Sequence, residues 1–279
     1  MLKNNTILIT GASRGIGQSC AIKLAKSNAR LIIHYNKNRA KAEETLKKLP
    51  QNDHMLIQAD LSKSEGIQIL VDYCIKNEII PDIIVNNAGI YEELDVASAS
   101  YEDWVESWEK TIQTNLFSYA HLSFLFARQM MKRKSGKIIN ISSRGAYRGE
   151  PTAMAYGASK AGVNSLTQSL ASALAPYNIF AYGIAPGFVD TEMSAYAMQS
   201  IRANQYKKQS PLNRIAKPEE VAHAVYMMCL NGNDFMRMEL HISDKKNPRN
   251  RGFITNAQSS RHKSRIFNRL SWISLFISS

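Results

Sequence analysis

The sequence predicts an α/β protein: a single domain with a three-layer architecture and a doubly wound parallel sheet. The first observation is that short segments rich in β-branched residues alternate with longer helical segments along most of the 279 residues. This alternation is typical of a parallel sheet covered by helices on both faces. The second is a glycine-rich turn, TGASRGIG, between the first predicted strand and the first predicted helix. No internal repeat or linker interrupts the pattern before residue 236.

The predicted elements follow one another in strict order, strand then helix. Six strands are expected, at Ile7 to Ile9, Leu31 to Ile33, Met55 to Ala59, Ile83 to Val85, Lys137 to Ile141 and Phe180 to Ile184. Helices are expected near residues 17–28, 39–49, 63–77, 101–133, 153–175 and 218–230. The last helix has favourable first-turn chemistry, because Pro218 is followed by Glu219 and Glu220.

The cysteine spacing and the N-terminal sequence indicate in which compartment the protein is expected. Cys20, Cys74 and Cys229 are scattered without Cys-x-x-Cys spacing, which favours buried reduced thiols over a disulfide framework or a metal site. The N-terminal MLKNNTILIT enters a strand directly and lacks the pattern of a secretory signal. No apolar segment reaches the ~18 residues that a membrane-spanning helix requires. We therefore expect a cytoplasmic protein.

The net charge of +12 is unevenly distributed. Residues 231–279 carry nine Lys/Arg and three Asp/Glu, so this segment supplies +6 of the total. The remaining +6 is spread over 230 residues, which indicates an ordinary solvated surface whose basic patches would suit an anionic cofactor or substrate. We do not expect a nucleic-acid partner.

The glycine-rich turn has the features of a nucleotide-binding loop. Glycines permit a tight turn and let backbone N–H groups approach a pyrophosphate at the N-terminus of the following helix. Their spacing here is Gly-x-x-x-Gly-x-Gly. The predicted cofactor contacts in this loop are Gly11, Ser13, Arg14, Gly15, Ile16 and Gly17.

A Tyr-x-x-x-Lys pair, Tyr156 and Lys160, is the main candidate for catalysis. On a helix the two side chains share one face, and we expect the ammonium to lower the pKa of the phenol from its usual value near ~10. Ser143, thirteen residues before the tyrosine, is placed to hydrogen-bond a substrate carbonyl; Ser142 is the alternative, and the spacing favours Ser143. On its own, a Tyr-x-x-x-Lys spacing more often lies on an ordinary solvated helix face. We therefore infer a catalytic role only because several motifs agree.

In this order, the motifs resemble those of the short-chain dehydrogenase/reductase family over roughly residues 5–236. The resemblance implies a Rossmann-like fold and hydride transfer with a nicotinamide cofactor. It implies that Tyr156 is the general acid in reduction and that Lys160 binds the nicotinamide ribose. It also implies that Ser143 orients the carbonyl and that Asn115, in TNLFSY, holds a water of the proton relay.

The end of the second predicted strand bears on the choice of cofactor. A carboxylate there would bind the ribose 2′-OH of NAD and repel the 2′-phosphate of NADP. The segment HYNKNRAKAEE has no acidic residue before Glu43, and Tyr35 occupies the position of the usual aspartate. Arg14, with Lys37 or Arg39, can pair with a phosphate. NADP is therefore the expected cofactor; the alternative is that Lys37 and Arg39 only solvate a loop.

Three further segments resemble cofactor contacts of the family. Asp60 and Leu61 follow the third predicted strand, where the family binds adenine. NNAG follows the fourth and resembles the turn beside the adenine ribose, while PGFVDT resembles the loop at the carboxamide end. The residues implied are Asp60, Leu61, Asn87, Ala88, Gly89, Pro186, Gly187, Val189 and Thr191.

PLNRIAKPEEVA and its surroundings are most similar to the bacterial 3-oxoacyl-(acyl-carrier-protein) reductases, which implies reduction of a carrier-bound 3-oxoacyl thioester. Acyl carrier proteins are acidic, and the run Lys132, Arg133, Lys134 is a candidate contact, although a helix C-terminus favours cations by itself. A second expected cation near Tyr177 is missing. The loop 144–151 is expected to line the substrate pocket. The alternatives are an NADP-linked alcohol, sugar or steroid dehydrogenase, and a catalytically idle nucleotide-binding protein.

The C-terminal segment departs from the family. The expected domain spans residues 1–236, and 237–279 is a basic tail with the composition of poorly ordered polypeptide. Where the family continues to a last strand ending Asp-Gly-Gly, this chain does not, so we expect that strand to be lost and the family's homotetramer or dimer to be weakened. A shifted reading frame is one hypothesis. A basic extension that touches a membrane or nucleic acid is the other, and its apolar end, 272–277, is too short to span a bilayer.

Overall fold

The computed structural model describes residues 2–50, 53–199, 204, 207, 208, 210, 212–232 and 239–241. Its centre is a seven-stranded sheet in the order β3-β2-β1-β4-β5-β6-β7, in which each pair of neighbours is parallel. Chain order runs outward from β1 in both directions, which confirms the predicted doubly wound sheet. The strands are β1 (Thr6–Ile9), β2 (Arg30–Tyr35), β3 (Met55–Gln58), β4 (Ile83–Asn86), β5 (Gly136–Ile141), β6 (Ile179–Ala185) and β7 (Glu239–His241).

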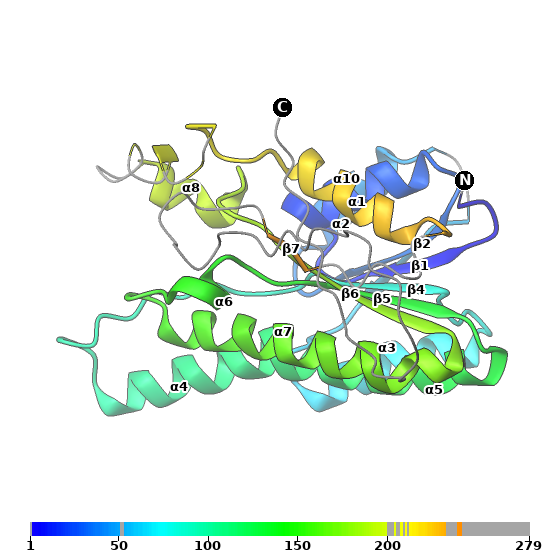
Figure 1. Cartoon of the computed structure of the whole chain (residues 1–279), viewed down its shortest axis with the longest axis horizontal. Helices are drawn as coiled ribbons and strands as arrows, with labels where there is room; N and C mark the ends of the chain where they lie inside the picture. Colours follow the sequence, from blue (N-terminus) through cyan, green and yellow to red (C-terminus); the bar gives the residue numbers. More distant parts are fainter. Residues whose placement is uncertain are drawn as a thin grey trace, which may run out of the picture.

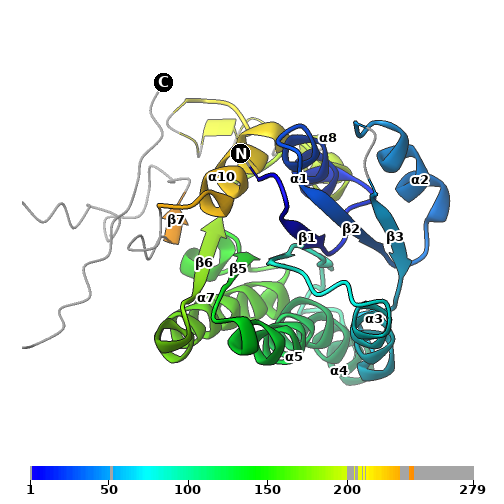
Figure 2. The same cartoon turned by 90° about the vertical axis from the view of Figure 1, so that its right-hand side faces the viewer.

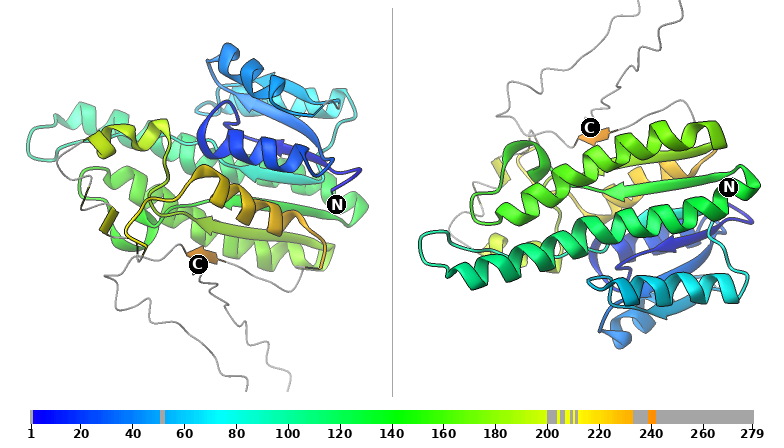
Figure 3. Two further views of the ribbon diagram at one scale, coloured as in Figure 1. Left: turned by 90° about the horizontal axis from the view of Figure 1, so that it is seen from above. Right: turned by 90° about the horizontal axis from the view of Figure 1, so that it is seen from below.

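Helices cover both faces of the sheet and complete the three layers (Figures 1 and 2). One face carries α1 (Gly15–Ala25), α2 (Arg39–Lys47) and α10 (Pro218–Cys229). The other carries α3 (Ser64–Lys76), α4 (Tyr101–Ile112), α5 (Ser118–Arg133) and α7 (Met154–Leu174). The two views of Figure 3 show these layers separately, with α1 and α10 above the strands and the long α4, α5 and α7 beneath them.

The strands are apolar on both sides because both faces are covered. Successive residues of β1 point to opposite faces: Ile7 and Ile9 pack in the core under α1 and α10, and Leu8 packs in the core over α3 and α5. All three side chains have no exposed surface. The sheet is therefore buried on both faces, and its carboxyl edge carries the loops that form the candidate active site.

The long helical segment expected at 101–133 is present but is not uniform. It consists of α4, a π-helical turn η1 (Gln113–Phe117) and α5 in direct succession. Ser100 caps the start of α4 in a reciprocal capping box with Asp103. Among the described residues, two short helices are additional to the prediction: α6 (Gly145–Arg148) and α8 (Glu192–Gln199), each following a strand at the carboxyl edge of the sheet.

The expected loss of the last strand is wrong in part. Glu239–His241 forms β7, parallel to Gly183–Ala185 of β6. Main-chain pairing needs an extended backbone more than a particular sequence, so a segment unlike the family's can still pair with this edge. The NDFM segment and residues 242–279 lie outside the described residues, so the order of the tail stays a prediction.

The described part of the chain contains no helix that is long and apolar enough to cross a membrane. It also contains no group of three His, Cys, Asp or Glu side chains arranged to hold a metal ion. Cys20, Cys74 and Cys229 are free and buried, as expected of small apolar side chains, and burial raises the pKa of Cys74 and Cys229 to about 12.

Candidate active site

The glycine loop joins β1 to α1 and leaves no room for side chains at two of its glycines. A Cβ on Gly11, whose φ is +64°, would lie 2.9 Å from the Cα of Ala88. A Cβ on Gly17 would lie 2.3 Å from the carbonyl oxygen of Gly11. The third glycine, Gly15, has a φ of +55° and lies against Thr191. The loop therefore carries no side chains at Gly11 and Gly17, as a loop that binds a pyrophosphate at the start of a helix requires.

His34 of β2 stabilises the glycine loop through hydrogen bonds, a role that was not predicted from the sequence. Its Nδ1 accepts a hydrogen bond from the Gly11 N–H at 3.1 Å, its carbonyl accepts one from the Ala12 N–H, and its Nε2 lies 2.9 Å from the carbonyl oxygen of Ala59. Burial lowers the pKa of His34 to about 4, so the ring is neutral and Nε2 donates. The sequence signal that could have identified this role is that His34 is a polar residue in an otherwise apolar run of strand β2.

Thr10 and Asn87 tie the glycine loop to the turn after β4. The Thr10 hydroxyl accepts from the N–H groups of Asn87 and Ala88 at 2.9 and 3.0 Å. The Asn87 side chain donates to the carbonyls of Thr10 and Gly11 at 2.9 and 3.2 Å. Asn87 was predicted to contact the ribose. In the structure its side-chain amide instead donates to the glycine loop and stabilises the conformation of that loop.

The predicted adenine end lies where β2 and β3 terminate. Tyr35 is buried at the end of β2, and Leu61 is buried after β3. The Asp60 carboxylate accepts hydrogen bonds from the N–H and hydroxyl of Ser62 at 3.1 and 2.7 Å. Burial raises the pKa of Asp60, but these hydrogen bonds and the nearby cations, Lys37 among them, outweigh it, so the pKa lies below its usual value.

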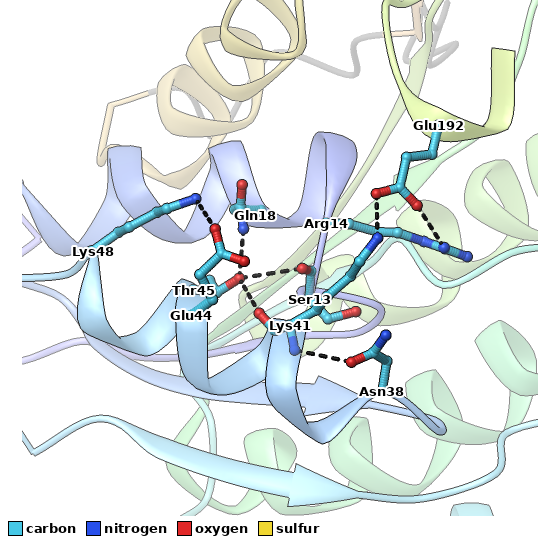
Figure 4. Close-up of polar contacts among 9 residues, drawn as sticks. All are labelled: Ser13, Arg14, Gln18, Asn38, Lys41, Glu44, Thr45, Lys48 and Glu192. Atoms are coloured by element: carbon cyan, nitrogen blue, oxygen red, sulfur yellow. Dashed lines mark hydrogen bonds and ion pairs between the residues drawn. The ribbon is translucent and has the colours of Figure 1, made fainter. Parts of the chain in front are cut away.

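Two of the predicted phosphate-binding cations, Arg39 and Arg14, face different carboxylates, and Figure 4 shows Arg14 beside Glu192. Arg39 pairs with Glu43 on the exposed side of α2 at 2.7 Å. The guanidinium of Arg14 instead meets Lys41 of α2 at the carboxylate of Glu192, the first residue of α8. Lys41 and Glu192 were missed because α8 was not predicted, so no partner for α2 was known.

The three main catalytic candidates come together at the carboxyl end of β5. Ser143 and Lys160 are buried, and Tyr156 is half-buried. The Tyr156 hydroxyl hydrogen-bonds the Ser143 side chain, and the Ser143 Oγ also accepts from the Gly145 N–H at 3.1 Å. The neighbouring Ser142 hydroxyl donates instead to the Lys160 carbonyl at 3.2 Å. The structure therefore directs Ser143, and not Ser142, at the phenol.

The electrostatics of this cluster differ from the expectation. Burial raises the pKa of Tyr156 above its usual value, against the hydrogen bond from Ser143 and the charge of Arg144. The expected net lowering is wrong here because desolvation of the phenolate is the larger effect. Lys160 is buried as well, and burial lowers the pKa of its ammonium to about 7. Its Nζ lies 5.8 Å from the centroid of the Tyr156 ring.

Main-chain contacts fix Lys160 and Asn115 in place. Lys160 Nζ donates to the carbonyl of Ile141 at 2.8 Å. Asn115, in the π-helical η1, accepts from the Ile90 N–H at 2.8 Å and donates to the Ile90 carbonyl at 2.9 Å. A π-helical turn inside a long helix is frequently found at a functional site. A Cβ on Gly89 would lie 3.2 Å from Asn115 Oδ1 and 3.7 Å from Lys160 Nζ, so the turn after β4 joins the cluster to the glycine loop.

The loop after β6 closes the far side of the site. The carbonyl of Pro186 accepts from the Arg144 N–H at 3.0 Å. Val189 is buried and pairs with Ala216, and the Thr191 side chain lies over Gly15. The remaining predicted contacts of these loops also lie at this edge: Ser13, whose carbonyl accepts from a threonine of α2, and Ile16 and Gly187, both half-buried.

The run Lys132, Arg133, Lys134 lies at the opposite edge of the sheet. It precedes β5, whose six residues span about 20 Å before Ser143 is reached. The Arg133 guanidinium contacts Asp82 at 3.2 Å and the carbonyl of Pro81 at 2.5 Å, both immediately before β4. This run is therefore not at the entrance of the site in its own chain, and its contacts tie the end of α5 to the sheet.

The arrangement fits a dinucleotide. The glycine loop, the turn after β4 and the Ser143 cluster lie along the carboxyl edge of the sheet. They flank the β1–β4 boundary, where the strand order reverses, which is the position of ligand sites in open α/β sheets. Cations stand at one end and proton-transfer groups at the other.

Comparison with known proteins agrees with this geometry. Residues 5–201 match the family model of short chain dehydrogenases. The 3-oxoacyl-[acyl-carrier-protein] reductase FabG of Aquifex aeolicus is 35% identical over 237 residues, which cover 82% of this chain and 91% of the relative. Glucose 1-dehydrogenase 2 of Bacillus subtilis is 32% identical over 230 residues, covering 80% and 86%. A solved structure of a variant actinorhodin polyketide ketoreductase with NADPH is similar with a TM-score of 0.75 and 27% identity, covering 82% and 92%. The chain belongs to the short-chain dehydrogenase family and is an oxidoreductase of the kind that uses a nicotinamide cofactor.

Proposed function

We propose that this protein is an NADPH-dependent reductase that converts the carbonyl of a 3-oxoacyl thioester to an alcohol. The observation that carries the proposal is the hydrogen bond between Tyr156 and the buried Ser143, beside the buried Lys160. The Gly89 turn connects this cluster to the glycine loop. Proton-transfer groups and a dinucleotide cradle thus share one edge of the sheet.

Ser143, Tyr156 and Lys160 have different roles at the carbonyl oxygen of the substrate. When bound, a reduced nicotinamide would provide the hydride for the carbonyl carbon. Ser143 and Tyr156 hold the oxygen through their hydroxyls, and the Gly145 N–H fixes the orientation of Ser143. Because burial raises the pKa of Tyr156, the phenol keeps its proton at neutral pH and donates it as negative charge develops on the oxygen. Lys160, whose pKa is about 7, lies beside it as the next proton donor.

The preference for NADP over NAD is supported by charge. The end of β2 carries Tyr35 in place of a carboxylate, and Arg14 stands in the glycine loop. The solved ketoreductase to which the chain is similar was determined with NADPH. A cation in this loop pairs with a ribose phosphate, which NAD lacks.

The thioester substrate is supported by the names of the reductase relatives. A sugar substrate is the second candidate, since the Bacillus relative is a glucose dehydrogenase. A mostly buried ion pair also favours it: Arg144 Nη2 lies 3.5 Å from Glu150 Oε1, and both charges act on Tyr156. Charged walls suit a polyol better than an acyl chain.

Purified protein, assayed for NADPH consumption with acetoacetyl thioesters and with a panel of sugars and simple ketones, tests the proposal. Turnover with the thioester is expected, and Tyr156→Phe should lower it about a thousandfold without weakening NADPH binding. Tyr177→Phe, an exposed position after α7, is the matched control and should behave as wild type. Undiminished turnover by Tyr156→Phe, or NADPH binding without turnover of any carbonyl, would refute it. Carrier recognition, oligomeric state and a cytoplasmic location stay predictions.

A further inference from the structure

A second buried tyrosine, Tyr119, contacts the ammonium of Lys160. The Tyr119 hydroxyl oxygen lies 3.4 Å from Lys160 Nζ and accepts a hydrogen bond from it, and Nζ lies 5.0 Å from the centroid of the tyrosine ring. Tyr119 has no exposed surface and Lys160 is 4% exposed, so both groups meet inside the protein. No step at the substrate carbonyl uses the Tyr119 phenol, so its place against the ammonium requires another explanation.

The carbonyl of Ile141, the last residue of β5, forms a triangle with these two groups. It accepts a hydrogen bond from Lys160 Nζ at 2.8 Å and one from the Tyr119 hydroxyl at 3.4 Å. Because the hydroxyl proton is directed to this carbonyl, an oxygen lone pair of Tyr119 faces the ammonium. An acceptor in that position favours the charged form of Lys160.

Tyr119 reaches the site through its position on the long helical segment. It is the second residue of α5, which begins directly after the π-helical η1, and α5 packs beside α7, the helix of Lys160 (Figure 2). Asn115, in η1, comes four residues earlier. Residues at this interval share a helix face, so one face of the segment supplies both the predicted relay residue and the buried phenol.

Tyr119 is not placed to pass a proton onward. Burial raises the pKa of its phenol well above the usual value, so the hydroxyl stays neutral. Its own proton is directed to a backbone carbonyl, and its side chain has no exposed surface. The hydroxyl can therefore hold Lys160 in place, but it cannot exchange protons with bulk water.

Few other groups act on the charge of Lys160. The titratable groups that face it are the phenols of Tyr119 and Tyr156, whose ring centroids lie 5.0 and 5.8 Å from Nζ. Among the described residues, no carboxylate and no second cation shifts the pKa of Lys160, and burial lowers it to about 7. An ammonium has three N–H groups, and the hydrogen bonds to Ile141 and Tyr119 leave one of them for a ligand.

We propose that Tyr119 is a positioning residue of the active site: its hydroxyl, together with a carbonyl of β5, fixes the Lys160 ammonium beside Tyr156 and stabilises its charge. The effect of Tyr119 on turnover rests on the proposed function. Its effect on Lys160 itself does not, because the contact is made without substrate or cofactor.

The proton affinity of Lys160 in the ligand-free full chain tests the contact directly. Isotope-labelled lysine gives an NMR signal for the carbon next to each ammonium, and Lys160→Met identifies the relevant signal by its absence. Tyr119→Phe should lower the proton affinity about threefold, which moves the titration midpoint down by about half a pH unit, because the ammonium loses an acceptor. Tyr182→Phe removes the hydroxyl of another buried tyrosine, in β6, and as the control should titrate like wild type.

A midpoint that is unchanged or higher in Tyr119→Phe overturns the proposal. Tyr119→Leu removes the ring as well as the hydroxyl and should move the midpoint at least as far in the same direction. This second variant keeps the test valid if circular dichroism shows that Tyr119→Phe does not fold.

The pH profile of turnover separates positioning from a purely structural role. The proposed reduction uses the Lys160 proton, so turnover falls as pH rises through the pKa of Lys160. In Tyr119→Phe this fall should occur about half a pH unit lower, while kcat at about pH 6 stays within about twofold of wild type. An equal loss of kcat at every pH would show a structural role only and would overturn the proposal.

The two proposals fail in different experiments. If the protein reduces no carbonyl, the proposed function is overturned, while the NMR titration still reports the effect of Tyr119 on Lys160. If wild-type protein turns over substrate but the midpoint does not move in Tyr119→Phe, only the role of Tyr119 is overturned.

Discussion

Replacing Lys160 with methionine is expected to stabilise the fold while abolishing activity. The ammonium is buried, and burial lowers its pKa from 10.5 to about 7. Because the unfolded chain binds the proton more tightly, the charged form costs free energy in the folded state. At pH 7 this cost is about 4 kcal/mol, from a difference of roughly 3.5 pKa units at about 1.4 kcal/mol each, reduced by half-titration.

The substitution also removes a contact. Lys160 Nζ donates to the Ile141 carbonyl at 2.8 Å, and losing this hydrogen bond to a buried oxygen costs about 1–3 kcal/mol. Methionine fills a similar volume, so packing changes little. The net expectation at pH 7 is a gain of about 1–3 kcal/mol in the free energy of unfolding.

The dependence on pH identifies the cause. The cost of the buried ammonium is complete below the folded pKa of about 7 and disappears as pH approaches the unfolded value of 10.5, so wild-type stability gains from rising pH in this window. Between pH 7 and 9 the advantage of Lys160→Met should shrink by about 2 kcal/mol. Other titrating groups are common to both proteins and cancel in the comparison.

Urea unfolding at pH 7 and pH 9, at one fixed protein concentration, measures this advantage. Lys26→Met removes an exposed ammonium from the end of α1 and should stay within about 0.5 kcal/mol of wild type at both values. An advantage of Lys160→Met that does not change with pH would refute the reasoning, since it would show that the ammonium is not desolvated.

Gly17→Ala should weaken NADPH binding more than about tenfold in a calorimetric titration, because its Cβ would lie 2.3 Å from the Gly11 carbonyl oxygen and must displace the loop; wild-type affinity would contradict that packing. Asn115→Ala loses two hydrogen bonds to the Ile90 backbone and should lower the free energy of unfolding by about 2–4 kcal/mol, so an unchanged melting curve would argue against them. Ser143→Ala should reduce turnover about a hundredfold while NADPH affinity stays within about twofold. A loss of NADPH affinity instead would indicate that the Ser143 hydroxyl contacts the cofactor and not the substrate.

Much of the fold was predictable because its signals are local. The apolar strands buried on both faces, the glycine spacing and the Tyr156–Lys160 interval each depend on residues close in sequence. The π-helical turn at Asn115 was not predictable, since it has no sequence signal of its own, and the contacts of Asn115 with Ile90 are made across 25 residues of the chain. Strand β7 was missed because backbone pairing with β6 leaves no signature in a three-residue segment.

By itself, the sequence determined the order of the first six strands and of the main helices, the glycine cradle and the set of residues brought to one edge of the sheet. Only the tertiary structure decided how those residues behave. Burial, which no local pattern reports, raises the pKa of Tyr156 and lowers that of Lys160 to about 7. Long-range packing, through Thr45 on the glycine loop, places Lys41 with Arg14 at Glu192. Charge and desolvation depend on neighbours that are distant in the chain, so they appear only when the chain is folded.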